Sequence, residues 1–201
     1  MRSATWQLAL ATGLGIVVAT LINYGTQSNA QQAPAVRAPA TAGNSATEVT
    51  KAICVITPLG DGKVSGKVVF TQQRGGVEVN AEITGLAPGE HGFHVHEFGD
   101  CSMVDGTCAG GHFNPTGAPH GGPDDEERHA GDLGNITADR SGKATYKRVD
   151  KMLALNGPNS IIGRSIIVHA DPDDLTSQPS GNAGARVGCG VIGIADPKME
   201  H

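Results

Sequence analysis

The sequence predicts an all-β domain, and three observations lead to this fold class. Apolar and polar residues alternate over 77–84, which is the period of a half-buried strand. Glycine accounts for 29 of 201 residues and aromatic residues for only 3%, a composition typical of short strands joined by tight turns. Beyond residue 30, no stretch of useful length carries a helical period.

Further strands are expected where apolar runs are bounded by turn residues. A weaker alternation over 64–70 resembles that of 77–84, and glycine-containing turns at 60–62, 74–76 and 140–142 separate such runs. The predicted strands cover 53–57, 64–70, 77–84, 92–98, 133–137, 166–170 and 187–194. About eight short strands with hairpin turns favour a sandwich or a barrel.

The N-terminal residues are expected to lie outside this domain. Arg2 is followed by an uncharged, mostly apolar run over 6–22, and Ser28 and Ala30 are small residues at the positions of a cleavage site. This pattern is typical of a signal peptide over 1–30, and the alternative is an uncleaved membrane anchor. Residues 31–48, rich in Ala and Pro, are predicted to form a disordered tether, followed by the barrel domain over 49–201.

Charge and cysteine content limit the possible partners and compartments. The formal net charge is −5, so the chain offers no basic field for nucleic acid. Export would place the chain in a periplasmic or extracellular compartment, where a disulfide among its four cysteines is plausible. Counting the cysteines does not decide which of them pair.

Two connections, 99–131 and 171–186, are too long for simple turns in a compact β domain, and long loops of this kind are usually functional or disordered. Both adjoin histidines, which favours function. His94 and His96 lie two residues apart on a predicted strand and therefore project from the same face. Such a pair alone is weak support for a metal site, since two histidines on a strand are common.

The loop histidines strengthen the case for metal. His112, His120, His129 and Asp132 occur together in a segment rich in Gly and Pro, and zinc accepts nitrogen and carboxylate ligands in a tetrahedral site. Each residue alone would be read as part of a solvated loop, but the set favours a metal centre. His169 ends another apolar strand, where a ligand can be held rigidly.

These motifs resemble those of the copper/zinc superoxide dismutase family. The segment 91–100, HGFHVHEFGD, is similar to the family's copper-binding strand. Four further motifs are similar to the family's zinc loop: GGHFNP (110–115), HGGP (120–123), DEERH (125–129) and GDLGN (131–135). Segments 161–164, 168–169 and 181–194 are similar to the family's last strands. The resemblance runs from about residue 51 to 195 and implies an eight-stranded antiparallel Greek-key β-barrel with two long functional loops.

The resemblance also implies ligands and chemistry. Copper would be bound by His94, His96, His112 and His169, and zinc by His112, His120, His129 and Asp132, with one ion of each metal per chain. The implied reaction converts superoxide to dioxygen and hydrogen peroxide by alternate reduction and oxidation of copper, with His112 bridging the two ions. Asp173 matches the carboxylate that links a copper ligand to a zinc ligand, and Arg186 matches the anion-guiding arginine. His112 and Arg186 are the expected catalytic residues.

Some features depart from the family pattern or are left open by it. The family forms one disulfide from the first long loop to the strand of Cys189; Cys101–Cys189 is favoured and Cys108–Cys189 is the alternative. The segment 175–186 is short and lacks the charged residues of longer family versions, so a weaker steering field is expected. The resemblance implies a homodimer. The alternative function is a copper chaperone or metal-buffering protein on the same barrel.

Overall fold

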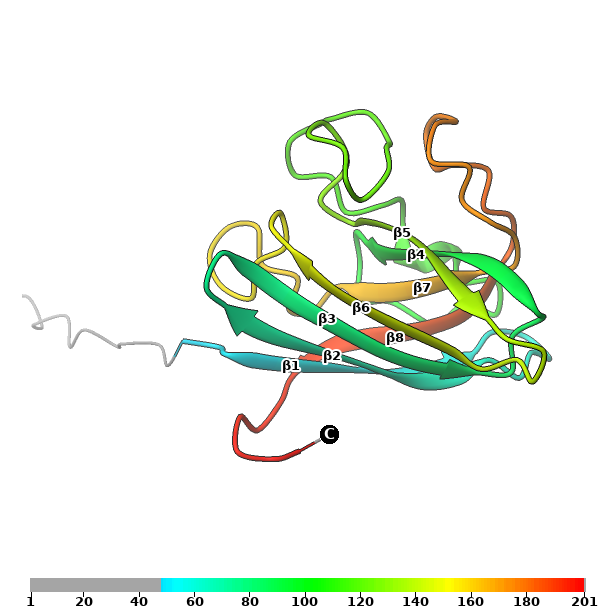
Figure 1. Ribbon diagram of the computed structural model, residues 1–201, viewed down its shortest axis with the longest axis horizontal. Coiled ribbons are helices and arrows are strands. Elements are labelled where there is room, and N and C mark those ends of the chain that lie inside the picture. Colours follow the sequence, from blue (N-terminus) through cyan, green and yellow to red (C-terminus); the bar gives the residue numbers. More distant parts are fainter. Residues whose placement is uncertain (1–47, 201) are drawn as a thin grey trace, which may run out of the picture. The chain divides into compact units, whose positions relative to one another are not determined.

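The computed structural model describes residues 48–200, which form a closed barrel of eight strands (Figure 1). The strands are β1 (Lys51–Pro58), β2 (Ser65–Gln73), β3 (Gly76–Thr84), β4 (Gly89–His96), β5 (Asp132–Ala138), β6 (Ala144–Asp150), β7 (Ser165–His169) and β8 (Arg186–Ile194). Around the barrel their order is β1-β2-β3-β6-β5-β4-β7-β8, and all neighbouring pairs are antiparallel. The all-β barrel prediction is confirmed.

The core lies inside the barrel, and strand periodicity fills it. On β3 the inward residues Val77, Val79, Ala81 and Ile83 are fully buried, as the alternation predicts. They pack in one apolar cluster with side chains of the other strands, including Phe70 and Phe93. Burial of these side chains supplies the main favourable free energy of folding.

The structure differs from the predicted strands at β6 and β4. β6 was not predicted, because three of its four inward side chains, those of Tyr146, Arg148 and Asp150, carry polar groups and the fourth belongs only to a small alanine, Ala144. The strand expected over 92–98 begins earlier, at Gly89, and ends at His96. The signal peptide predicted over 1–30 and nearly all of the tether over 31–48 lie outside the described residues. Within residues 48–200, no helix is long and apolar enough to span a membrane.

Two long loops lie on the same side of the barrel (Figure 1). The first connects β4 to β5 and contains one short 3₁₀ turn, η1 (Thr107–Ala109), and the second connects β7 to β8. On β4, Phe93 and Val95 contribute to the core, while His94 and His96 point to the opposite face. His94 and His96 are nevertheless buried. The outer face of β4 is therefore the place where a buried polar site can form.

Candidate metal centre

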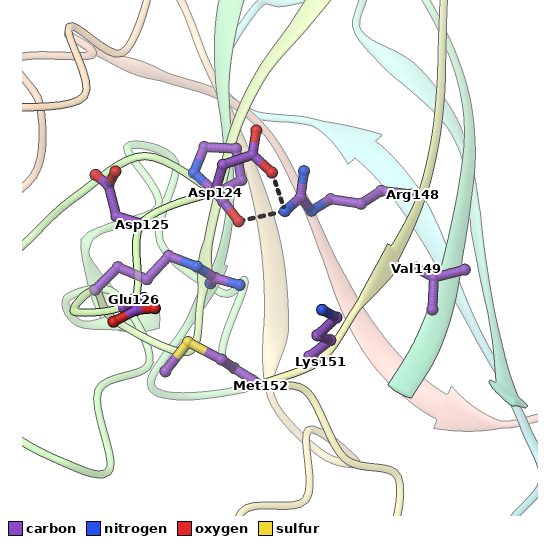
Figure 2. A pocket seen from close by; sticks show the side chains of 9 residues that line it. Asp124, Asp125, Glu126, Arg148, Val149, Lys151 and Met152 are labelled. Carbon is purple, nitrogen blue, oxygen red and sulfur yellow. Dashed lines mark hydrogen bonds and ion pairs between the residues drawn. The ribbon is translucent and has the colours of Figure 1, made fainter. Parts of the chain in front are cut away.

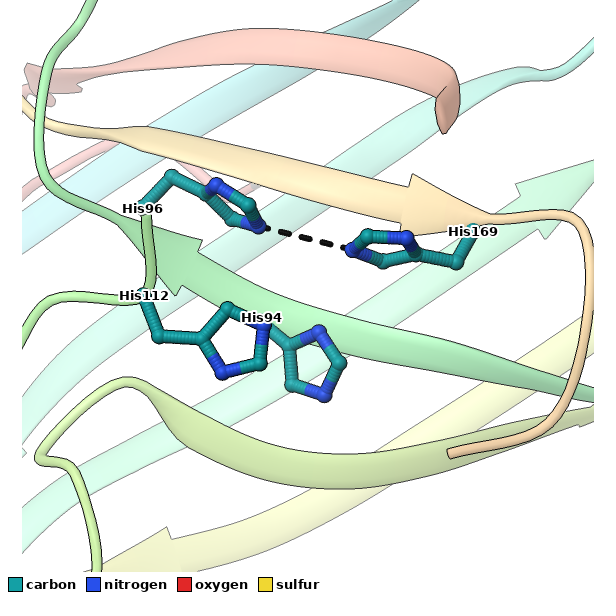
Figure 3. Close-up of side chains that lie close together, drawn as sticks. All are labelled: His94, His96, His112 and His169. Atoms are coloured by element: carbon teal, nitrogen blue, oxygen red, sulfur yellow. Dashed lines mark hydrogen bonds between the residues drawn. The ribbon is translucent and has the colours of Figure 1, made fainter. Parts of the chain in front are cut away.

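Four histidines from three parts of the chain converge on the outer face of β4. His94 and His96 come from β4, His112 follows η1, and His169 ends β7 (Figure 3). Each ring offers one nitrogen, and these four nitrogens all lie within 4.8 Å of one another. None of the four residues is more than 8% exposed. The structure thus brings together the residues expected to bind copper.

The hydrogen bonds of His96 and His169 show which nitrogens carry lone pairs. Nδ1 of His96 lies 3.0 Å from the carbonyl oxygen of Gly110, and Nδ1 of His169 lies 3.2 Å from that of Gly184. Because a carbonyl oxygen only accepts, Nδ1 must be the donor in each neutral ring. The two Nε2 atoms then face each other with lone pairs, 3.4 Å apart. A cation between them removes this repulsion, so the pair fits a metal ion.

Asp173 orients two histidines, His94 of the set just described and His120 of a second set nearby. One carboxylate oxygen lies 2.8 Å from Nε2 of His94, and the other lies 2.9 Å from Nε2 of His120. Each Nε2 donates to the carboxylate, so each Nδ1 carries a lone pair. Among the described residues, the buried Nδ1 of His94 has no hydrogen-bond partner, and the buried Nδ1 of His120 lies 3.1 Å from Oδ1 of Asp132. Such outer carboxylates fix the tautomer and the ring orientation of metal ligands.

The second set of possible metal ligands gathers around Asp132. Its Oδ1 lies 2.7 Å from Nδ1 of His112 and 3.1 Å from Nδ1 of both His120 and His129. A tetrahedral zinc site has metal–ligand distances of about 2.0–2.1 Å and therefore ligand–ligand edges of about 3.3 Å. The two separations of 3.1 Å are close to those edges, and the separation from His112 is shorter. Oδ2 accepts the backbone N–H groups of Gly121 and His129, so Oδ1 is the oxygen that faces the three imidazoles and could bind an ion together with them.

His112 belongs to both sets. Its Nδ1 faces Asp132, while its Nε2 is buried and has no hydrogen-bond partner among the described residues. Its ring stacks on that of His94, with centroids 3.9 Å apart. A single imidazole therefore lies between the two sets and can offer one nitrogen to each.

The electrostatics of the two sets differ. Burial lowers the pKa of His94 to about 3 and that of His169 to about 4, so both rings are neutral with free lone pairs at neutral pH. Burial also lowers the pKa of His120, but hydrogen bonds and charge from Asp132 and Asp173 outweigh it and raise that pKa to about 9. The two carboxylates therefore favour a cation at His120, and a metal ion can take the place of the proton.

A cavity of about 540 Å³ opens above the first set. Its lining includes His96, His112, His169 and Arg186. The Arg186 guanidinium donates to the carbonyl oxygens of Gly106 and Gly110, each at 2.6 Å. These bonds fix a positive charge beside the histidines.

A disulfide anchors the loop that holds Arg186. It joins Cys101, in that loop, to Cys189 on β8. Cys54 is buried and free, and Cys108 is half-buried and free. The geometry therefore gives the favoured pairing rather than the alternative through Cys108.

Sequence reasoning missed several residues that support the site. The amide of Asn135, part of a glycosylation sequon, exchanges two hydrogen bonds with the backbone of Asp173. The amide of Gln178 does the same with the backbone of His120. The partners lie 38 and 58 residues away. No local pattern in the sequence could have indicated contacts of this kind.

Comparison with known proteins finds a family model and curated relatives that match this chain. The family model described as copper/zinc superoxide dismutase (SODC) matches residues 64–192. A protein of Paramecium bursaria Chlorella virus 1, named as a Cu-Zn superoxide dismutase, is 50% identical over 163 residues. That alignment covers 77% of this chain and 86% of the viral protein.

Proposed function

The chain belongs to the copper/zinc superoxide dismutase family, and we propose that one of its two ligand sets binds the redox-active copper ion and the other binds zinc. It is an oxidoreductase that converts superoxide to dioxygen and hydrogen peroxide, with copper and zinc as cofactors. Copper would be held by His94, His96, His112 and His169. Zinc would be held by His112, His120, His129 and Asp132.

The facing lone pairs of His96 and His169 are the observation that carries this assignment. Copper bound there supplies one-electron redox chemistry, whereas zinc has none and serves a structural role. The protein supplies the rest. Asp173 keeps His94 and His120 in the tautomers that present Nδ1. Nε2 of His112, which has no hydrogen-bond partner within residues 48–200, is placed to hold a proton on its way to the reduced superoxide.

Arg186 is the proposed guide for the substrate anion. After loss of residues 1–30 the chain would carry 14 basic and 20 acidic residues, so its overall field repels superoxide. A local positive charge can reverse that field near the site. The guanidinium of Arg186, fixed in the cavity that His96, His112 and His169 line, is suited to this task.

Replacing Arg186 with glutamine is expected to slow the metal-loaded enzyme about tenfold by removing the local attraction for the anion. The copper and zinc content should stay unchanged, because Arg186 is not a ligand. Stopped-flow measurement of superoxide decay, with metal analysis of the same sample, checks both points. Arg186→Lys keeps the charge and should retain more of the rate. An unchanged rate in Arg186→Gln would contradict the guiding role, and no catalysis by the fully loaded parent chain would contradict the reaction itself.

A homodimer is proposed on the basis of exposed apolar residues on paired strands. Val55 on β1 is 60% exposed, and Val191 and Ile194 on β8 are 45% and 67% exposed. β1 and β8 pair directly, so these exposed apolar side chains lie on neighbouring strands, where a second copy could cover them.

Ile194→Asp is expected to shift the chain from dimer to monomer in sedimentation velocity, because a carboxylate would be buried without a partner in the interface. Val149 is also exposed but lies on β6, so Val149→Asp is the matched control and should remain dimeric. A parent chain that sediments as a monomer would contradict the proposal.

Export to the periplasm or the outside of the cell is proposed from the leader and the disulfide. A disulfide such as Cys101–Cys189 persists in oxidising compartments. The N-terminal sequence of the chain recovered from its host distinguishes a cleaved signal peptide from a retained membrane anchor. A start near residue 31 supports a signal peptide over 1–30, and an intact Met1 region supports a membrane anchor.

A further inference from the structure

A cavity of about 550 Å³ lies outside the metal centre, between the first long loop and the end of β6 (Figure 2). The loop contributes residues 123–126 and Arg128 to its wall. The end of β6 contributes Arg148 and Val149, and the residues just after it contribute Lys151 and Met152. The proposed function gives this region no role. Its polar contacts nevertheless lead back to the zinc ligands.

Arg148 connects the two walls of the cavity. Its Nη2 donates to the carbonyl oxygen of Pro123 and to Oδ1 of Asp124, the latter at 2.8 Å (Figure 2). Both partners lie within four residues of His120 in the sequence. Charge-assisted hydrogen bonds of this kind are about twice as strong as neutral ones. One barrel side chain therefore holds the loop directly after a zinc ligand.

The same network reaches the other zinc ligands. Nε of Arg148 lies 3.6 Å from Oδ2 of Asp150, which also receives Nη2 of Arg128 at 2.5 Å. Nη1 of Arg128 donates to the carbonyl oxygens of His129 and Asp132. Asp150 thus connects both arginines, and together they hold both ends of the segment 120–132.

This segment needs such support, because residues 113–131 contain no strand or helix. His120 and His129 would otherwise lose conformational freedom each time an ion binds. Ligands held in place by surrounding hydrogen bonds bind metal more tightly than ligands on a loose loop.

We infer that Arg148 is a positioning residue for the zinc ligands, acting through the backbone of Pro123 and the side chain of Asp124. This inference rests on the proposed assignment of zinc to His112, His120, His129 and Asp132. Arg148 touches neither the ligand side chains nor the cavity above the copper set. Its effect should therefore fall on zinc and spare copper.

The test compares zinc release from the full chain loaded with copper and zinc. Arg148→Met keeps much of the side-chain length but removes the donors, and zinc transfer to a chromophoric chelator should become about tenfold faster. Copper release should be unchanged. Arg148→Lys keeps one charged donor and should lie between Met and the parent.

Lys147→Met is the matched control. Lys147 is the neighbouring cation on β6, but it points to the other face and pairs with Glu78 at 3.6 Å. It should release zinc at the parent rate. Hydrogen exchange of the metal-free chains adds a second readout, and amides over 120–125 should exchange faster in Arg148→Met than in Lys147→Met.

Zinc release from Arg148→Met within about twofold of the parent would overturn the inference. Equal acceleration of copper and zinc release would also overturn it, because it would indicate general loss of stability. Neither result would contradict the proposed zinc ligands, provided that the parent chain takes up zinc. A parent chain that takes up copper but no zinc would instead overturn the ligand assignment, and the inference with it.

Discussion

Replacing His112 with alanine should abolish dismutation, with a fall in the rate of superoxide consumption of at least about 100-fold. Changes to residues that merely support metal ligands already cost about 10–100-fold, and His112 offers one nitrogen to each of the two sets. Its loss should lower the occupancy of both ions. Stopped-flow decay of superoxide, together with metal analysis after loading, measures both effects.

His129→Ala is the matched control for His112→Ala. His129 belongs to the second set only, so this variant should lose zinc and keep copper. The contrast between the two variants isolates the sharing of His112. Equal retention of copper and rate in His112→Ala and His129→Ala would contradict the view that one imidazole serves both sets.

Loss of the disulfide should have the largest effect on stability. Cys101 and Cys189 are 88 residues apart, and a cross-link closing a loop of that length is worth about 4 kcal/mol, chiefly by restricting the unfolded chain. Cys101→Ser should lower the free energy of unfolding by about this amount, measured by urea denaturation. The rate should also fall, because Gly106 and Gly110 in the released loop hold Arg186.

Cys108→Ser is the control for this prediction, since Cys108 lies in the same loop and is free. Its effect on the free energy of unfolding should stay below about 1 kcal/mol. A larger loss in Cys108→Ser than in Cys101→Ser would indicate that Cys108 forms the pairing with Cys189 in solution.

Strands were predictable where the inward face is apolar and not where most inward side chains carry polar groups. β3 shows the first case, with four fully buried inward residues. β6 shows the second. Tyr146 donates to the carbonyl oxygen of Leu133, Arg148 to that of Pro123, and Asp150 pairs with Arg128. Its inward side chains are satisfied by distant partners, so their polarity conceals the strand from any periodicity analysis.

The metal centre, like the fold, could be predicted only in part from the sequence. The sequence by itself predicted the candidate ligand residues and their order along the chain. Strand geometry puts His94 and His96 on one face, and the resemblance of the loop motifs to those of the family implied the other candidates. It also indicated the all-β fold. These features depend on residue type and short-range spacing, which a sequence displays directly.

Only the tertiary structure decided how these residues work together. The tautomers of His96 and His169 follow from carbonyl oxygens 14 and 15 residues away. The backbone of Asp173 is held by Asn135, and the loop after His120 is held by Arg148 on β6. Such contacts join main-chain groups to distant side chains, and they exist only after the barrel closes and the two loops fold over its outer face. Local spacing carries no record of them, so the support that Asn135 and Arg148 give to the site emerged only in three dimensions.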